Sequence, residues 1–186
     1  MNINNKSEKE NTYDAIVVGT GVSGGWAAKE LTAGGLKTLV LERGRDVKHV
    51  KDYPTMNKNT WELPYRDQLT AKERKDYSVQ LRTGYTVKQS TKHWWVKDTE
   101  QPYTEKKGGF DWIRGYHVGG RSLLWGRQVY RWSKQDFEAN AKEGVSIDWP
   151  IRYSDIEKWY DHVENFIGVS GMSEKLPQLP DGQFLP

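Results

Sequence analysis

The sequence contains no cysteine, which excludes disulfide bonds, thiolate metal sites and cysteine nucleophiles. Apolar residues are also few, at 35% of 186 residues. No apolar run approaches the ~18–20 residues that a membrane-spanning helix needs. Residues 1–12 are polar and lysine-bearing and lack the apolar segment of a secretory signal. We therefore interpret them as a short disordered lead, and a cytoplasmic location follows by default.

An excess of one charge is missing as well. The 28 Lys and Arg residues and 25 Asp and Glu residues give a net charge of +3, and they are scattered along the chain. A nucleic-acid-binding protein would have a basic stripe or a recognisable reading motif, and we expect no nucleic-acid partner. The nine Trp and ten Tyr residues offset the low apolar content, because each aromatic side chain buries a large area. The chain is predicted to be mostly folded.

The first folded segment has the pattern of a βαβ unit. Residues 14–19 are an apolar run closed by glycine, which is typical of a buried parallel strand. Residues 23–33 carry the small side chains of a helix that packs close to a sheet, and glycines follow it. Residues 37–41 read as a second buried strand. Strand, helix and strand within about 30 residues predict a βαβ unit.

A dinucleotide-binding fingerprint lies between the first strand and the helix. Gly19, Gly21 and Gly24 have the spacing G-x-G-x-x-G. In this motif the first glycine permits the tight turn, the second admits a pyrophosphate, and the third lets the helix pack against the strand. Glu42 follows the second strand, 23 positions after Gly19, where an acid accepts hydrogen bonds from ribose hydroxyls. A glycine-rich turn without a ligand is disfavoured, because all parts occur in the right order.

The cofactor can be FAD or NAD. An NAD domain usually continues into further βαβ units soon after the second strand. Here residues 45–108 are polar, charged and rich in aromatic residues, with no clean period. The tripeptide Glu42-Arg43-Gly44 is also typical of flavoproteins. The sequence therefore favours FAD, and an NAD(P)-linked reductase is the less favoured alternative.

We interpret residues 45–108 as a mixed α+β insertion, although a plain solvated excursion fits the pattern equally well. Thr70 and Glu73 form a possible capping box that opens a short helix. Residues 78–96 alternate loosely between polar and apolar positions, which favours strands.

Two further helices are predicted after residue 132. Ser133 is a suitable N-cap for a helix that runs to about residue 142. Ser154 and Glu157 form a capping box before a helix of about 13 residues that ends at Gly168. The apolar stripe of this second helix consists of Ile156, Trp159, Tyr160, Val163 and Ile167. A helix of this length is marginal alone, so we expect the stripe to pack on another surface.

Several segments resemble a known family. Residues 114–126, Arg-Gly-Tyr-His-Val-Gly-Gly-Arg-Ser-Leu-Leu-Trp-Gly, resemble the second flavin-contacting segment of the glucose–methanol–choline (GMC) oxidoreductases. Residues 148–155, Asp-Trp-Pro-Ile-Arg-Tyr-Ser-Asp, the helix after them and Gly-Val-Ser-Gly at 168–171 resemble the segment that follows in that family. Leu-Pro-Asp-Gly at 179–182 resembles the next stretch. With residues 13–44, the resemblance covers a little over half of the chain.

The sugar- and polyol-oxidising bacterial dehydrogenases and the pyranose oxidases are the branch that the sequence resembles most. The resemblance implies an FAD cofactor and oxidation of a CH–OH group of a sugar, polyol or other alcohol by hydride transfer to the flavin. The predicted cofactor-binding residues are Gly19, Thr20, Gly21, Val22, Ser23, Gly24, Glu42, Arg43, Val118, Gly119, Gly120, Ser122 and Trp125. By this resemblance, Trp125 stands where the family places a residue against the isoalloxazine ring.

Two positions depart from the family pattern. Leu124 occupies the position at which the pyranose oxidases carry a histidine linked covalently to the flavin, and leucine has no nucleophile. We therefore predict non-covalent FAD. Arg121 replaces a residue that is commonly small. A guanidinium near a phosphate or reduced flavin and an arginine that points to solvent both fit this position.

No catalytic residue is assigned. The catalytic histidine of the family lies near the C-terminus of a much longer chain, and none of the four histidines here, His49, His93, His117 and His162, matches it. No metal-ligand spacing stands out either. We expect a small-molecule alcohol or sugar as substrate, and the electron acceptor is open.

The expected fold class is α/β: a Rossmann-like FAD-binding βαβ unit with the α+β insertion, incomplete without a C-terminal part. Residues 13–186 would form the N-terminal part of the FAD-binding domain, in which residues 109–186 hold the second flavin segment and the following helix. A chain of this length would leave sheet edges and apolar faces uncovered, so we expect a truncated sequence. The alternative is a natural short subunit completed by a partner, which includes a non-catalytic FAD-binding or assembly subunit.

Overall fold

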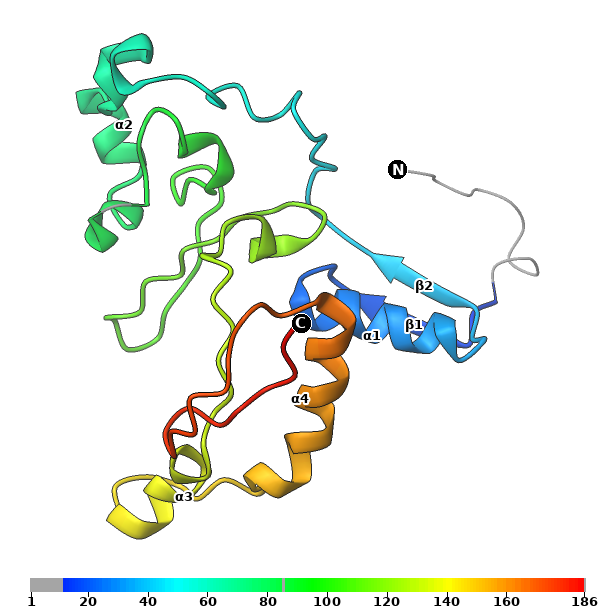
Figure 1. The fold of residues 1–186 in the computed structure, drawn as a ribbon. Coiled ribbons are helices and arrows are strands. Elements are labelled where there is room, and N and C mark those ends of the chain that lie inside the picture. Colours follow the sequence, from blue (N-terminus) through cyan, green and yellow to red (C-terminus); the bar gives the residue numbers. More distant parts are fainter. Residues whose placement is uncertain (1–11, 85, 186) are drawn as a thin grey trace. The chain divides into compact units, whose positions relative to one another are not determined.

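A computed structural model describes residues 12–84 and 86–185 (Figure 1). The chain forms two compact units, Met1–Trp125 and Gly126–Pro186, and each is described by itself. The fold is mixed α/β, with one two-stranded parallel sheet and four α-helices among the described residues. Of the predicted disordered lead, residues 1–11 lie outside the described part of the chain.

The first unit opens with strand β1 (Ala15–Val18), helix α1 (Val22–Ala33) and strand β2 (Thr38–Leu41). The two strands pair in parallel, with Ala15 opposite Thr38. The helix begins directly after the glycine-rich loop and ends at Gly34. The predicted order of strand, helix and strand is therefore confirmed.

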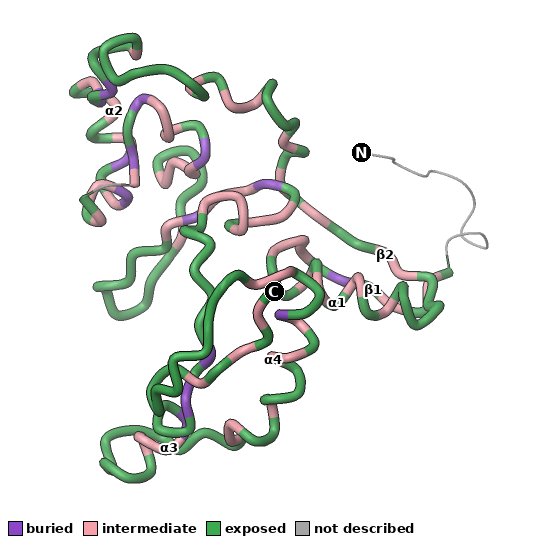
Figure 2. Tube along the Cα trace, viewed as in Figure 1, coloured by how far each residue is buried: buried purple, intermediate pink, exposed green. Residues whose placement is uncertain are grey.

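The prediction that both strands are buried is wrong for this chain. Val17 is the one buried residue of β1, whereas the side chains on either side of it, Ile16 and Val18, are 62% and 81% exposed (Figure 2). In β2, Leu41 is 49% exposed. A strand is buried on both faces only inside a wider, helix-covered sheet, and in the described residues β1 and β2 pair only with each other.

The segment 45–108 consists of turns and short helices. Helix α2 (Ala71–Asp76) begins at the predicted capping box, where Thr70 and Glu73 exchange hydrogen bonds. The strands predicted within residues 78–96 are absent from the described residues of that range, so the β part of the α+β insertion is wrong. The hydroxyls of Thr83 and Thr86 both donate to the carbonyl of Gln80, at 2.8 and 3.0 Å. Such local bonds compete with a strand ladder.

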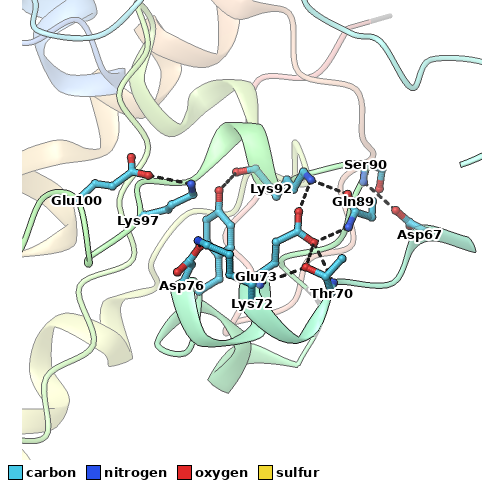
Figure 3. A network of polar contacts seen from close by, with 11 residues as sticks. Asp67, Thr70, Lys72, Glu73, Asp76, Gln89, Ser90, Lys92, Lys97 and Glu100 are labelled. Atoms are coloured by element: carbon cyan, nitrogen blue, oxygen red, sulfur yellow. Dashed lines mark hydrogen bonds and ion pairs between the residues drawn. The ribbon is translucent and has the colours of Figure 1, made fainter. Parts of the chain in front are cut away.

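The insertion nevertheless has a small core of its own, so a plain solvated excursion is also wrong. Leu69, Tyr77 and Val87 are buried together, and Leu81 and Trp95 pack against them. A polar network lies beside this core (Figure 3).

The centre of that network is the Glu73 carboxylate. It accepts hydrogen bonds from the Thr70 N–H at 2.8 Å, from the Gln89 amide at 2.6 Å and from the Lys92 ammonium (Figure 3). The bond from Lys92, followed by that from the Thr70 N–H, lowers the pKa of Glu73 to about 2. The charged form of Glu73 therefore stabilises the folded insertion.

The second unit holds two helices. Helix α3 (Lys134–Glu143) begins at Ser133, whose hydroxyl accepts a hydrogen bond from the Asp136 N–H, and this predicted N-cap is confirmed. Helix α4 (Tyr153–Ile167) is longer than expected, with 15 residues. Of the helices in the described residues, none is long and apolar enough to cross a bilayer.

The capping box predicted at Ser154 and Glu157 is wrong. Helix α4 begins earlier, at Tyr153, and the Asp155 carboxylate accepts a hydrogen bond of 2.8 Å from the Arg152 N–H. Gly168 adopts a left-handed conformation after the last turn, with φ of 73°, as its position predicts.

Helix α4 is held by a buried ion cluster rather than by its apolar stripe. The predicted stripe is only half-buried, and its Trp159 is 58% exposed. The buried residue of α4 is Glu164, which accepts a hydrogen bond of 2.9 Å from the Arg131 Nε. Arg131 also donates to Asp161 at 2.5 Å, and Glu164 accepts from the Gln183 N–H at 2.7 Å. This cluster ties the C-terminal tail and the segment before α3 to α4.

Candidate cofactor-binding site

The glycine-rich loop between β1 and α1 uses two of its glycines for the turn itself. Gly19 has φ of +90°, a conformation that favours glycine. A Cβ on Gly24 would clash with the carbonyl oxygen of Gly19 and would lie 3.0 Å from the carbonyl carbon. The roles that the fingerprint predicts for these two residues, a tight turn and close packing of helix on strand, agree with this geometry.

The second segment of the resemblance, around residues 118–122, contacts this loop directly. The Gly119 N–H donates to the Thr20 hydroxyl at 2.9 Å. A Cβ on Gly120 would lie only 2.8 Å from the Gly21 Cα, and Gly120 has φ of +59°. Two segments that are 99 residues apart therefore meet at this loop.

A short parallel bridge extends this contact along the end of β2. The Val118 N–H donates to the Arg45 carbonyl at 2.9 Å, and Arg45 pairs with His117. A Cβ on Gly44 would lie 2.5 Å from the Tyr116 carbonyl carbon. Only glycine fits at this position. Gly44 was predicted only as part of a tripeptide typical of flavoproteins, although a glycine shortly after a strand can itself indicate a close backbone approach.

Glu42 is fixed at the end of β2 by backbone and hydroxyl donors. One carboxylate oxygen accepts from the Thr20 N–H at 2.8 Å and from the Thr20 hydroxyl at 2.6 Å. The other oxygen accepts from the Gly44 N–H at 2.6 Å. Burial tends to raise the pKa of Glu42, but these hydrogen bonds from Thr20 and Gly44 lower it below its usual value. Glu42 is therefore ionised at neutral pH.

A pocket of about 640 Å³ opens above the loop. Its walls combine both predicted segments. The predicted cofactor residues that line it are Gly19, Gly21, Val22, Ser23, Gly24, Ser122 and Trp125. Val18, Arg121 and Leu124 complete its wall. Trp125, which lines the pocket, is 46% exposed, so part of its surface is accessible.

The other predicted residues lie around the pocket rather than in its wall. The Thr20 hydroxyl donates to Glu42 and accepts from the Gly119 N–H, so hydrogen bonds join these three residues. Gly120 lies against Gly21, and the Val118 N–H is used by the bridge to Arg45. Arg43 turns elsewhere: its guanidinium lies 3.9 Å from the ring centroid of Tyr116 and donates to Gln101 at 3.0 Å. The bridging role of the Thr20 hydroxyl was not predicted.

The histidines lie outside the pocket wall. His117 is 2% exposed and packs edge-on against Trp94, with ring centroids 5.3 Å apart. Burial, together with the positive charge of Arg45, lowers the pKa of His117 and of His93. Both imidazoles are therefore neutral at pH 7.

No family model matches the chain. Among curated proteins, it is 30% identical over 173 residues to the gluconate 2-dehydrogenase flavoprotein of Pantoea cypripedii, a match that covers 85% of this chain and 25% of that protein. It is 27% identical over 177 residues to the fructose dehydrogenase large subunit of Gluconobacter japonicus, with coverage of 90% and 29%. It is 26% identical over 175 residues to the 2-methyl-1,2-propanediol dehydrogenase of Mycolicibacterium austroafricanum, with coverage of 90% and 26%.

The chain thus spans about a quarter of the length of the curated relatives it matches. Two aminoglycoside-modifying oxidases from Streptomyces species match at 23% and 24% identity. The homologues of this chain are GMC-type sugar and polyol oxidoreductases, and the resemblance to this family found in the sequence is confirmed.

Proposed function

We propose that this chain supplies the Rossmann-like FAD-binding part of an oxidoreductase that oxidises a CH–OH group of a sugar, polyol or other alcohol. The observation that carries the proposal is the pocket shared by the Gly19–Gly24 loop and the segment of Ser122 and Trp125. Both segments were assigned to one flavin cofactor on sequence alone. The similarity to a flavoprotein that is named for gluconate oxidation supports the same assignment.

The residues present fit a dinucleotide. A Cβ on Gly21 would meet no atom within 4 Å, so the packing of the protein does not itself require glycine there. Gly21 is the N-cap of α1 and has no side chain to cap the helix. The first N–H groups of α1 are then available to phosphate oxygens, which the helix dipole also favours.

Each neighbouring group has a role toward the bound cofactor. Glu42, held ionised by Thr20 and Gly44, accepts hydrogen bonds from the ribose hydroxyls. Trp125 offers its exposed ring face to the isoalloxazine. Bound FAD supplies the acceptor for the hydride that leaves the carbinol carbon. The substrate identity and the base that takes the hydroxyl proton are not assigned to residues of this chain.

The flavin is proposed to be non-covalent. Leu124 lines the pocket at the position where the pyranose oxidases carry their linked histidine, and its side chain forms no bond to a flavin. Acid precipitation of the holoenzyme should therefore release the yellow colour into the supernatant. Yellow colour that stays with the washed precipitate would refute this assignment.

The visible absorbance spectrum of the purified holoenzyme tests the function. A flavin spectrum should be present, and it should bleach when one of a panel of sugars, sugar acids and polyols is added without oxygen. A protein that is colourless and cannot be reconstituted with FAD would contradict the proposal. Bleaching by NADH or NADPH alone, with no response to any alcohol, would favour the NAD(P)-linked reductase instead.

A non-catalytic FAD-binding or assembly subunit is the second candidate. It is favoured by one observation, namely that no histidine is among the residues that line the described cofactor pocket. This candidate predicts a flavin that binds stably and that no alcohol in the panel reduces.

A further inference from the structure

Arg121 is the only residue with a charged side chain among those that line the described cofactor pocket. It lies on the short helical turn Gly120–Leu123, directly after the contact between Gly119 and the glycine-rich loop. A Cβ on Gly120 would lie only 2.8 Å from the Gly21 Cα, so the backbone that carries Arg121 is packed against the loop. The guanidinium of Arg121 therefore extends from a fixed point beside the pocket.

The polar groups of the protein hold this guanidinium only weakly. Its hydrogen bond to the Ile113 carbonyl is long, at 3.4 Å. In the described part of the chain, no carboxylate forms an ion pair with Arg121, whereas Arg114 and Arg131 are each paired with an acid. A guanidinium carries several N–H donors in a planar fork. Most of the donors of Arg121 are therefore available to a ligand in the pocket.

An aromatic ring of the insertion supports the guanidinium from one side. The guanidinium carbon of Arg121 lies 5.6 Å from the ring centroid of Trp95, within the range of a cation–π interaction. The indole N–H of Trp95 donates to the Thr86 carbonyl at 3.0 Å, and Trp95 packs against the small core of the insertion. Contacts within the insertion therefore fix the ring on which the guanidinium rests.

A dinucleotide in this pocket would need a positive charge beside it. Each phosphate of FAD carries a negative charge, and Glu42 next to the loop is ionised as well. The N–H groups at the start of α1 supply only about half an elementary charge. The first turn of α1, residues 22–25, has no charged side chain. The guanidinium of Arg121 is thus the cation of the pocket lining that can balance the phosphates.

We propose that Arg121 is the counter-ion of the cofactor pyrophosphate and that the insertion, residues 45–108, positions it through Trp95. A guanidinium binds a phosphate through two parallel hydrogen bonds, which give the contact both strength and direction. This inference rests on the proposed function, because the pocket has to hold a dinucleotide. It also distinguishes this chain from the family that it resembles, in which a small residue is common at the position of Arg121. The insertion thereby has a role in retaining the cofactor.

Two probes, FAD and ADP, test the contact with Arg121. ADP carries the pyrophosphate and lacks the isoalloxazine ring. The full-length protein is freed of flavin, and the dissociation constant of each probe is measured by calorimetry. Arg121→Gln should raise both dissociation constants by a similar factor, about tenfold to a hundredfold, the loss expected for hydrogen bonds between charged groups. Arg121→Lys should give an intermediate loss, because the charge remains and the planar fork is lost.

A double-mutant cycle tests the role of Trp95 as a positioning residue. Trp95→Leu should raise the dissociation constant of FAD by about twofold to fivefold, as expected for a lost cation–π contact. Trp95→Phe keeps an aromatic face and should retain most of the affinity. In the Arg121→Gln background, Trp95→Leu should have no further effect, because the ring acts only through the guanidinium. Leu81→Ala loosens the same core without a residue of the pocket lining and is the control.

The proposal is overturned if Arg121→Gln binds FAD as tightly as the wild type, or no more weakly than Arg74→Gln, a control at an exposed arginine of α2 outside the pocket lining. A loss with FAD but not with ADP would place the guanidinium at the isoalloxazine ring and overturn it too. Equal losses in Leu81→Ala and Trp95→Leu would remove the positioning role of Trp95. A wild-type protein that binds neither probe contradicts the proposed function, and this inference with it.

Discussion

The glycine-rich loop of the first unit and helix α4 of the second are fixed by opposite means. Around the loop, Gly24 and Gly120 let backbone meet backbone because they have no side chain. Around α4, the long side chains of Arg131 and Glu164 fill the interior with opposite charges. The first arrangement is intolerant of added volume, since the contacts at Gly24 and Gly120 leave no room for a side chain. The second tolerates a change of shape better than the loss of one charge.

The largest effect on stability is expected where a substitution leaves one buried charge without its partner. Arg131→Met should destabilise the protein by about 3–5 kcal/mol, because Glu164 would stay buried without its partner. Chemical denaturation measures this loss. Lys142→Gln removes an exposed ion pair with Glu138 and serves as the control, at about 1 kcal/mol or less. Equal losses of unfolding free energy in the two variants would mean that the buried ion pair contributes no more to stability than an exposed one.

The next largest effect is expected at the tightest glycine. Gly24→Ala should cost about 1–3 kcal/mol, since its Cβ would clash with the Gly19 carbonyl and the helix would have to shift. Gly25→Ala, one residue along, is the matched control. Its Cβ would lie 3.6 Å from the Thr20 carbonyl oxygen, an ordinary contact, and alanine favours the helix. A stable Gly24→Ala variant would contradict the account of close packing.

The hydrogen-bond network around Glu73 in the insertion also depends on charge, so its stability should depend on pH. The pKa of Glu73 is about 2 when folded against 4.5 unperturbed. After screening by solvent, ionised Glu73 contributes about 1–2 kcal/mol to the free energy of unfolding. This contribution is present above pH 4.5 and is lost as the pH falls toward 2. Denaturation at several pH values, with Glu73→Gln beside the wild type, checks this. The difference between the two should shrink with acid, and a constant difference would argue against it.

The smallest effect on stability should accompany a complete loss of cofactor binding. Gly21→Asp adds a side chain where no atom lies within 4 Å, and aspartate is a good N-cap, so stability should change by less than about 1 kcal/mol. The carboxylate would, however, occupy the proposed phosphate site and repel the cofactor phosphates. FAD titration monitored by fluorescence should show no binding. Unchanged FAD affinity in a folded variant would refute the fingerprint assignment.

The sequence predicted local structure where one residue type has one physical role. The turn at Gly19, the capping box at Thr70 and the N-cap at Ser133 all occur as expected. The prediction that residues of the Gly19–Gly24 loop bind one cofactor together with Ser122 and Trp125 came from a resemblance. These residues line one pocket, and their role toward a cofactor stays a prediction. Local pattern alone carries no information about such a contact across 99 residues.

The failures concern burial and long-range partners. Periodicity marked the apolar stripe of α4, yet the helix buries Glu164, because Arg131 lies far along the chain and its approach leaves no periodic trace. Residues 78–96 alternated like strands, but threonine hydroxyls bonded locally to the Gln80 carbonyl.

The hydroxyl of Thr20 donates to Glu42 and accepts from the Gly119 N–H, and this has a consequence for the folding pathway. Closing a contact over 99 residues carries an entropy cost that grows with loop length and slows folding. The βαβ unit can form early from local contacts. The hydrogen bond between Gly119 and Thr20 can form only after this long closure. The small core of Leu69, Tyr77 and Val87 lies in the sequence between the two ends of this contact, and its formation before closure would shorten the chain that remains to be closed.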